Sequence, residues 1–227
     1  MRIGIIVAMD KEYAQLQSVA TDMKKEHIGG RDFITARIGQ NDVVMEQCGI
    51  GKVNSAVGAA EMIAHYHPDL VVSTGVAGGA STTLDVLDVV VSTECTYHDV
   101  YCGDECQKGQ VLGLPARYAI NPVHVAKAMS IDCGVRVRKG LIVTGDWFVN
   151  TREKMQSILD DFPEAMAVDM ESCSIAQTCH LYNTPFVSFR IISDIPLKDN
   201  KAQQYYDFWD RMAEGSFHVT EAFLKAL

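Results

Sequence analysis

Two apolar segments in the last third of the chain carry a carboxylate near their carboxyl ends. One runs from Ala165 to Ser172 and contains Glu171, and the other runs from Phe186 to Asp194. An apolar strand that stops at an acid delivers it to the carboxyl edge of a buried sheet, where open α/β folds bind their ligands. A carboxylate there must be solvated or paired, so stability alone gives little reason for its position. The alternative is that both acids only begin helices, since Asp and Glu favour the first helical turn.

Three further loops that follow predicted strands also carry residues suited to a ligand site. Glu12 lies just beyond the first strand, the glycine-rich loop Gly75–Gly79 follows another, and Gly145–Val149 brings Trp147 and Phe148 after a third. Together the five loops supply acids, glycines and aromatic rings but no cluster of lysines. The sequence therefore predicts a pocket for a mostly uncharged, partly aromatic ligand, with carboxylates for proton and hydroxyl chemistry.

Strand and helix patterns alternate along the whole chain. The predicted strands are Arg2–Ala8, Phe33–Ile38, Asp42–Cys48, Leu70–Ser73, Asp88–Ser92, Val135–Thr144 and Phe186–Ile192. The predicted helices are Asp10–Met23, Lys52–Tyr66, Glu153–Leu159, Ser172–Leu181 and a last helix with apolar residues from Tyr205 to Phe223. Without a linker or an internal repeat, this order predicts one α/β domain over residues 1–227, with a mixed central sheet flanked by helices.

Composition excludes several classes of protein. Hydrophobic residues make up 48% of the 227 residues and charged residues 22%, which is typical of a soluble globular domain. The apolar N-terminus reaches Asp10 too early for a signal peptide, and no run approaches the length of a membrane span. Seven cysteines, mostly within apolar segments, indicate free thiols and a cytoplasmic location. The net charge of −9 argues against nucleic acid or an anionic membrane as a partner.

Positive charge is scarce around the glycine-rich loop. Between Lys52 and Arg117 the only Lys or Arg is Lys108. Gly75–Gly79 therefore makes a weak phosphate site, and its glycines are better suited to letting the backbone approach a neutral ligand.

The order and spacing of several short motifs resemble a known family. The motifs are Gly4-Ile5-Ile6 with Ala8-Met9 and Glu12, Gly49-Ile50-Gly51-Lys52-Val53, Thr74-Gly75 with Ala77-Gly78-Gly79, Tyr97-His98-Asp99, Gly140-Leu141-Ile142-Val143 with Gly145-Asp146, Val168 with Met170-Glu171, and Arg190 with Ile192-Ser193-Asp194. From Met1 to nearly the C-terminus, the chain resembles the bacterial 5′-methylthioadenosine/S-adenosylhomocysteine nucleosidases of the nucleoside phosphorylase superfamily. The resemblance implies a nucleoside phosphorylase-like fold and hydrolysis of the N-glycosidic bond of these two nucleosides to adenine and a 5′-thio-substituted ribose.

The resemblance also implies roles for individual residues. Asp194 would be the general acid that protonates N7 of adenine, with a pKa raised by burial, and Glu12 would be the general base that activates water for attack on C1′. Glu171 would hold the ribose hydroxyls, while Phe148 would stack on the purine. The implied substrate-binding residues are Met9, Ile50, Ala77, Gly78, Phe148, Val149, Met170, Glu171, Ser193 and one of Tyr205 or Tyr206.

Further expectations concern partners and two departures from the family pattern. The loop after Tyr97-His98-Asp99 would help close the slot for the 5′-substituent on a neighbouring subunit, so we expect a homodimer, with no cofactor and no metal. Val76 stands where the family carries a hydroxyl residue, which removes one polar contact. The loop Val100–Leu114 is rich in cysteine and lacks the family's aromatic pattern.

Four other interpretations remain open from the residues alone. A nucleoside phosphorylase on the same fold would need cations for phosphate. A futalosine-type hydrolase would bind a substrate with a carboxylated 5′-tail, which Asp104 and Glu105 in the candidate tail loop disfavour. A nucleoside sensor would bind without turnover. A zinc site could use Cys95, His98, Cys102 and Cys106, but their spacing matches no closed zinc motif.

Overall fold

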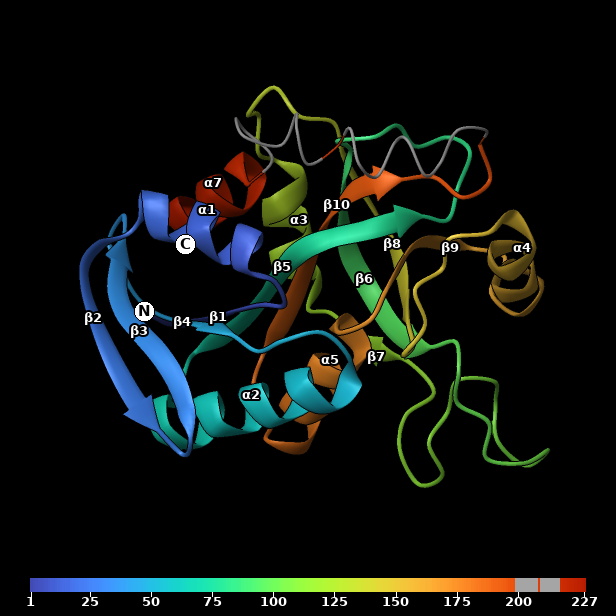
Figure 1. Cartoon of the computed structure of the whole chain (residues 1–227), viewed down its shortest axis with the longest axis horizontal. Helices are drawn as coiled ribbons and strands as arrows, with labels where there is room; N and C mark the ends of the chain where they lie inside the picture. Colours follow the sequence, from blue (N-terminus) through green and yellow to red (C-terminus); the bar gives the residue numbers. More distant parts are fainter. Residues whose placement is uncertain (199–207, 209–216) are drawn as a thin grey trace.

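A computed structural model of the chain describes residues 1–198, 208 and 217–227. Within these ranges one mixed sheet has the strand order β10-β6-β8-β9-β5-β1-β4-β3-β2, with β7 paired to β6 (Figure 1). The strands are β1 (Arg2–Val7), β2 (Thr21–Ile28), β3 (Arg31–Ile38), β4 (Asn41–Gln47), β5 (Leu70–Gly79), β6 (Val89–Tyr97), β7 (Tyr118–Ala119), β8 (Val137–Thr144), β9 (Ala165–Asp169) and β10 (Phe186–Asp194). The helices are α1 (Asp10–Val19), α2 (Lys52–Tyr66), α3 (Pro122–Met129), α4 (Arg152–Asp161), α5 (Ser172–Leu181) and α7 (His218–Ala226).

The predicted fold class, an α/β domain with a mixed sheet flanked by helices, is confirmed. In Figure 1, α2 and α5 lie on one side of the sheet, and α1, α3 and α7 lie on the other. The central strands are buried because they are apolar on both sides, and all nine residues of β10 are buried. A strand covered on both faces needs a continuous apolar run, which is the pattern that Phe186–Ile192 shows.

Strand β5 closes part of the sheet on itself. It pairs in parallel with β1 and β10 and in antiparallel with β9, while β10-β6-β8-β9 completes the circuit. Gly78 near its end pairs with Asp194 on one side and with Val168 on the other. The two acid-bearing segments predicted from the sequence therefore meet across a single glycine. A side chain at Gly78 would crowd this junction, since an added Cβ would lie 3.1 Å from Cγ1 of Val168.

The structure corrects some predicted elements. The predicted helix Asp10–Met23 is too long: α1 ends at Val19, and Thr21–Ile28 forms β2, an edge strand paired with β3. Most residues of β2 are exposed, so the sequence lacks the alternation that marks a half-buried strand. Strand β7 and helix α3 were not predicted, although Asn121 caps α3 by accepting a hydrogen bond from the amide of Val123.

Other predicted elements match the observed ones or extend beyond them. The hairpin of β3 and β4 and the helices α2 and α5 are confirmed, while β5 and β10 run beyond their predicted ends. The first part of the last predicted helix, including Tyr205, lies outside the described residues, and α7 forms its end. Among the helices that the structure describes, none combines the length and the apolar character needed to cross a membrane.

Candidate active site

The carboxyl ends of β1, β5, β9 and β10 and the loops after β4 and β8 surround one pocket. Its lining residues are Ala8, Met9, Glu12, Ile50, Val76, Ala77, Gly78, Trp147, Phe148, Val149, Val168, Asp169, Met170, Glu171, Ser193 and Asp194. Every predicted site residue that the structure describes is in this set. Tyr205 and Tyr206 lie outside the described residues.

Glu12 is held at the pocket wall by backbone amides. Its Oε2 accepts hydrogen bonds from the amides of Ala8 (3.1 Å) and Met9 (3.0 Å), and its Oε1 accepts one from Val76 (2.9 Å). Glu12 is therefore a helix-start residue and a pocket residue at once, because it lies in the first turn of α1. A carboxylate has about four acceptor positions, so three bonds leave one position for a ligand.

The environment of Glu12 suits a base. Burial raises the pKa of its carboxyl group, while the three amides and the charge of Arg190 oppose this rise. Gly75 makes room for the carboxylate, because a Cβ at that residue would lie 2.6 Å from Oε1 of Glu12. The side chain of Val76 plays no part in holding Glu12, since the contact uses its main-chain amide.

Glu171 lies directly before α5 and faces the start of α2. Its Oε1 accepts a 2.9 Å hydrogen bond from the amide of Gly51, and its Oε2 lies 4.0 Å from Nη2 of Arg190. Burial and the nearby carboxylate of Asp169 raise the pKa of Glu171 to about 7, against the opposing charge of Arg190 and the Gly51 hydrogen bond. Glu171 can therefore change its charge near neutral pH.

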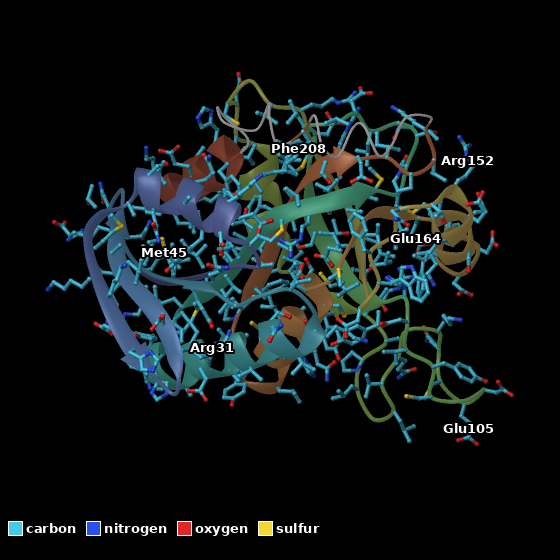
Figure 2. The ribbon with its side chains drawn as sticks, viewed as in Figure 1. Arg31, Met45, Glu105, Arg152, Glu164 and Phe208 are labelled. Carbon is cyan, nitrogen blue, oxygen red and sulfur yellow. The ribbon has the colours of Figure 1, made fainter. Side chains whose placement is uncertain are left out.

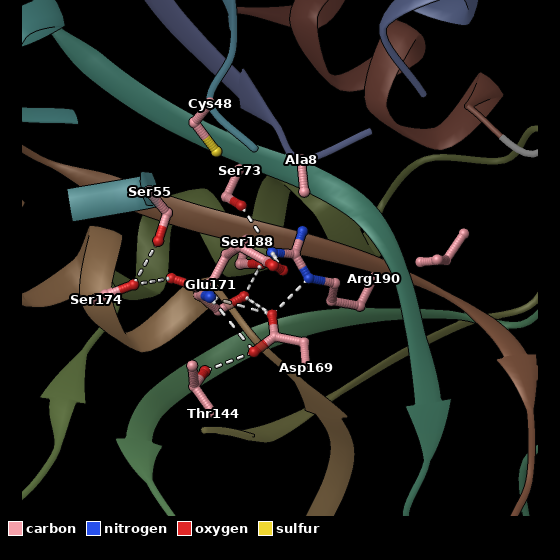
Figure 3. Close-up of polar contacts among 12 residues, drawn as sticks. Ala8, Cys48, Ser55, Ser73, Thr144, Asp169, Glu171, Ser174, Ser188 and Arg190 are labelled. Carbon is pink, nitrogen blue, oxygen red and sulfur yellow. Dashed lines mark hydrogen bonds and ion pairs between the residues drawn. The ribbon is translucent and has the colours of Figure 1, made fainter. Parts of the chain in front are cut away.

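Beneath Glu171 lies a buried ion pair that sequence reasoning missed. Nε of Arg190 donates to Oδ2 of Asp169 at 2.6 Å, and Nη2 of Arg190 donates to Oγ of Ser73 at 2.9 Å (Figure 3). Asp169 also accepts a hydrogen bond from Thr144 Oγ1. Arg190 lies in a predicted motif, but nothing in the local sequence marks Asp169 as its partner.

Asp194 is the last residue of β10 and pairs with Gly78 of β5, which also pairs with β9. The hydroxyl of Ser193 donates to Oδ1 of Asp194 at 2.7 Å and lies 3.2 Å from the carbonyl oxygen of Ala77. Asp194 is only 6% exposed, so its carboxyl group faces an environment with little water. An acid at this position can exchange a proton with a bound ligand.

The outer part of the pocket is apolar and aromatic. Trp147 and Phe148, each 56% exposed, and Ile50, 52% exposed, are the exposed residues of its lining and mark its mouth. Large aromatic surfaces at a pocket mouth favour stacking with a flat ring. The pocket residues to which the sequence analysis assigned no binding or catalytic role are Ala8, Val76, Trp147, Val168 and Asp169. Trp147 lies in the loop Gly145–Val149 that the sequence marked as a source of aromatic rings.

The four residues considered for zinc do not form a site. Cys95 is buried while Cys102 is exposed, and no group of three or more His, Cys, Asp or Glu residues in the described ranges could hold a metal ion. His98 packs against Gly145, where a Cβ would lie 2.4 Å from its Cε1. The loop Val100–Leu114 projects from the body of the fold, and Glu105 is labelled at its outer end in Figure 2.

Comparison with known proteins agrees with this geometry. The family model described as the phosphorylase superfamily matches residues 2–225. A 5′-methylthioadenosine/S-adenosylhomocysteine nucleosidase from Bacillus subtilis (strain 168) is 37% identical over 231 residues, covering 100% of this chain and 98% of the relative. The chain therefore belongs to the phosphorylase superfamily and, within it, to the family of the 5′-methylthioadenosine/S-adenosylhomocysteine nucleosidases.

Solved structures place the fold in the same family. The nucleosidase of this type from Neisseria meningitidis, in complex with methylthio-immucillin-A, superposes with a TM-score of 0.93 at 35% identity, covering 100% of this chain and 99% of that one. The futalosine hydrolase of Helicobacter pylori strain 26695 has a TM-score of 0.91 at 24% identity over 100% of this chain and 98% of that one, which shows a shared fold only.

Proposed function

We propose that this protein hydrolyses the N-glycosidic bond of 5′-methylthioadenosine and S-adenosylhomocysteine, releasing adenine and the 5′-thio-substituted ribose. The observation that carries the proposal is that three buried acids, Glu12, Glu171 and Asp194, line one pocket whose mouth is aromatic. The substrate has a flat base, a sugar with hydroxyl groups and an apolar thioether, and the pocket offers a matching surface for each. Membership in the nucleosidase family supports the same substrates.

The proposed chemistry assigns one acid to each end of the breaking bond. As the bond lengthens, positive charge builds on the ribose and negative charge collects on adenine, so Asp194 donates a proton to N7. Glu12, with one acceptor position left by its three amide bonds, removes a proton from the attacking water. General acid and base steps each lower a barrier by about 3–5 kcal/mol.

The other proposed contacts orient the nucleoside. Glu171 accepts hydrogen bonds from the ribose hydroxyls, Met170 packs beneath the sugar, and Phe148 stacks on the purine, whose edge meets the main chain of Val149. Ala77, Gly78 and Ser193 complete the wall beside Asp194, while Met9 and Ile50 border the 5′-substituent. One of Tyr205 or Tyr206 is proposed to join them.

Water rather than phosphate is the proposed nucleophile. Among the residues that the structure describes, no Lys or Arg lines the pocket. Arg190 lies close by, but its guanidinium already donates to Asp169, Ser73 and the carbonyl oxygen of Phe189. A phosphate ion would have to displace these partners, which disfavours phosphorolysis.

The test is adenine release from purified protein, with and without phosphate. We expect adenine and the free 5′-methylthioribose or S-ribosylhomocysteine at equal rates in both conditions. A sugar 1-phosphate that appears only with phosphate would identify a phosphorylase, and binding without adenine release would identify a sensor. Futalosine should be a poor substrate, and its preferential cleavage would contradict the proposed substrates.

We also propose a homodimer. Ile50, which lies just before the N-cap residue Gly51, and Val53 and Val57 on α2 are 52%, 74% and 45% exposed. Because Ile50 also lines the pocket, a second copy of the chain packed against these three residues would close the slot for the 5′-substituent. The loop Val100–Leu114 of the second copy is the proposed cover of this slot.

We further propose that residues 1–227 act as one nucleosidase domain and that the protein is cytoplasmic. Its seven free cysteines support the cytoplasmic location.

A further inference from the structure

Asp169 is a buried carboxylate at the pocket wall that has no acceptor position left for a substrate. It accepts hydrogen bonds from Oγ1 of Thr144 (2.5 Å), from the amide of Ser172 (3.1 Å) and from Nε of Arg190 (2.6 Å), and Oγ of Ser172 also donates to it. Its side chain is 1% exposed. Three of these bonds reach Oδ2, while Oδ1 accepts from Thr144 and, at 3.3 Å, from the amide of Ser172, so both oxygens are engaged by the protein. Asp169 therefore cannot act on the substrate directly.

The donors that Asp169 holds are connected to Glu171, and the charge of Arg190 also reaches Glu12. Ser172 is the first residue of α5 and follows Glu171, so the bonds from its amide and hydroxyl fix the backbone on which Glu171 stands. Arg190 is held by Asp169 on one side and Ser73 on the other, with its Nη2 4.0 Å from Oε2 of Glu171. Figure 3 shows the Asp169 carboxylate directed at the Arg190 guanidinium, beside Glu171.

We propose that Asp169 is a positioning residue for the active site: it fixes the Arg190 guanidinium and the start of α5, and thereby sets the place of Glu171 and the electric field at Glu171 and Glu12. A buried guanidinium without its partner is strongly unfavourable, so the pair holds one arrangement. The proposal rests on the proposed roles of Glu171 and Glu12.

The charges around Glu171 give this proposal a measurable consequence. Asp169 on β9 and Glu12 on α1 face it with negative charge, Arg190 on β10 faces it with positive charge, and the thiol of Cys48 and the amide of Gly51 complete its surroundings. After burial, the negative charge of Asp169 is the larger cause of the raised pKa of Glu171. Removing that charge leaves Arg190 uncompensated, so the pKa of Glu171 should fall.

The experiment compares kcat and KM for 5′-methylthioadenosine over pH 5–9 in the parent and in Asp169→Asn, Asp169→Glu and Glu171→Gln. The rise or fall of kcat/KM with pH that is present in the parent and absent in Glu171→Gln is the limb of the pH profile that reports the ionisation of Glu171. In Asp169→Asn we expect this limb to move to lower pH by about one unit and kcat/KM at the optimum to fall at least about tenfold. Asp169→Glu keeps the charge, so its limb should stay at the parent position.

Two controls separate this inference from the proposed function and from a purely structural role. If Glu171→Gln leaves activity and profile unchanged, the proposed role of Glu171 is wrong. If Glu171→Gln impairs the enzyme but Asp169→Asn lowers only the melting temperature, with no shift of the limb, Asp169 is structural and the inference fails. If Asp169→Asn does not fold, Thr144→Val is used in its place. This variant removes one hydrogen-bond donor to Asp169 and keeps the charges of Asp169 and Arg190. A loss of about threefold or more in kcat/KM supports the proposal, and an unchanged value overturns it.

Discussion

The main-chain amide of Gly51 donates a 2.9 Å hydrogen bond to Oε1 of Glu171, although the two residues lie 120 positions apart. Gly51 is the residue before α2, so the positive end of that helix faces the carboxylate and favours its ionised form. The next amide, of Lys52, donates to Oδ1 of Asp146 at 2.8 Å. The loop before α2 thereby joins the start of α5 to the loop that carries Trp147 and Phe148.

Replacing Gly51 should disturb the substrate site without unfolding the protein. Gly51 has φ +98°, and an added Cβ would lie 3.0 Å from Oδ1 of Asp146, so Gly51→Ala displaces the amide that binds Glu171. Losing one charge-assisted hydrogen bond of about 1.5–3 kcal/mol predicts a fall of about ten- to a hundredfold in kcat/KM. Gly134→Ala is the matched control, because Gly134 has φ +75° with open space around it. Equal kinetics in the two variants would contradict the importance of this contact.

Glu12→Gln should separate the chemistry from binding. The substitution keeps the size of the side chain and removes the base, so kcat should fall at least about a hundredfold while substrate still binds. Binding is measured by calorimetry and turnover by adenine release. Glu153→Gln is the control, since Glu153 is also an acid in the first turn of a helix but is exposed on α4. Near-parent turnover in Glu12→Gln would reduce Glu12 to a residue that begins α1.

The stability of the fold should depend on pH through Glu171. Its pKa is raised from 4.5 to about 7, so the folded state holds the proton more tightly than the unfolded chain does. This stabilisation is complete below about pH 4.5 and is lost as the pH rises through about 7. The glutamine in Glu171→Gln cannot ionise, so this variant does not lose stability in this way. The free energy of unfolding of the variant minus that of the parent should therefore rise between pH 4.5 and 8 by on the order of 3 kcal/mol. Urea titrations at both pH values measure the difference, and a pH-independent difference would exclude the raised pKa.

The acids of the site were predictable because each follows an apolar strand, and a loop after such a strand reaches the sheet edge where ligands bind. Glu12, Glu171 and Asp194 were placed in this way. Asp169 was not, because a saturated buried acid and a substrate-facing acid look alike in sequence, and only the contact with Arg190 separates them.

The elements that escaped prediction lack a buried face of their own. Strand β2 is exposed along most of its length and takes its conformation from pairing with β3, so Thr21–Met23 resembled the end of a helix. The sequence also did not predict that the sheet closes through β5, where one strand pairs with β10 along most of its length, with β1 over its first half and with β9 at its end. Long-range pairing of this kind leaves no local pattern.

The proposed dimer predicts that a charged side chain on the exposed face of α2 prevents the two subunits from associating. Val53 is 74% exposed in the single chain, so Val53→Lys should convert a dimer to a monomer and raise KM for substrates with a 5′-thio group. Val123→Lys is the control, because Val123 is 69% exposed on α3, on the other side of the sheet. Light scattering after size exclusion gives the mass. A parent protein that is monomeric and fully active at the assay concentration would contradict the proposal.

The proposed hydrolysis depends most directly on Asp194 as the proton donor to adenine. Asp194→Asn is nearly isosteric and should still accept the Ser193 hydroxyl at its amide oxygen, but an amide cannot deliver a proton to N7. The decisive measurement is adenine release in a single turnover with enzyme in excess over 5′-methylthioadenosine, with adenine binding as the check on folding. We predict intact adenine binding, almost no adenine release, and a residual rate below that of Glu171→Gln, which still offers the ribose one acceptor and one donor. Release of adenine by Asp194→Asn at a rate close to the parent would place the general acid elsewhere and contradict the mechanism.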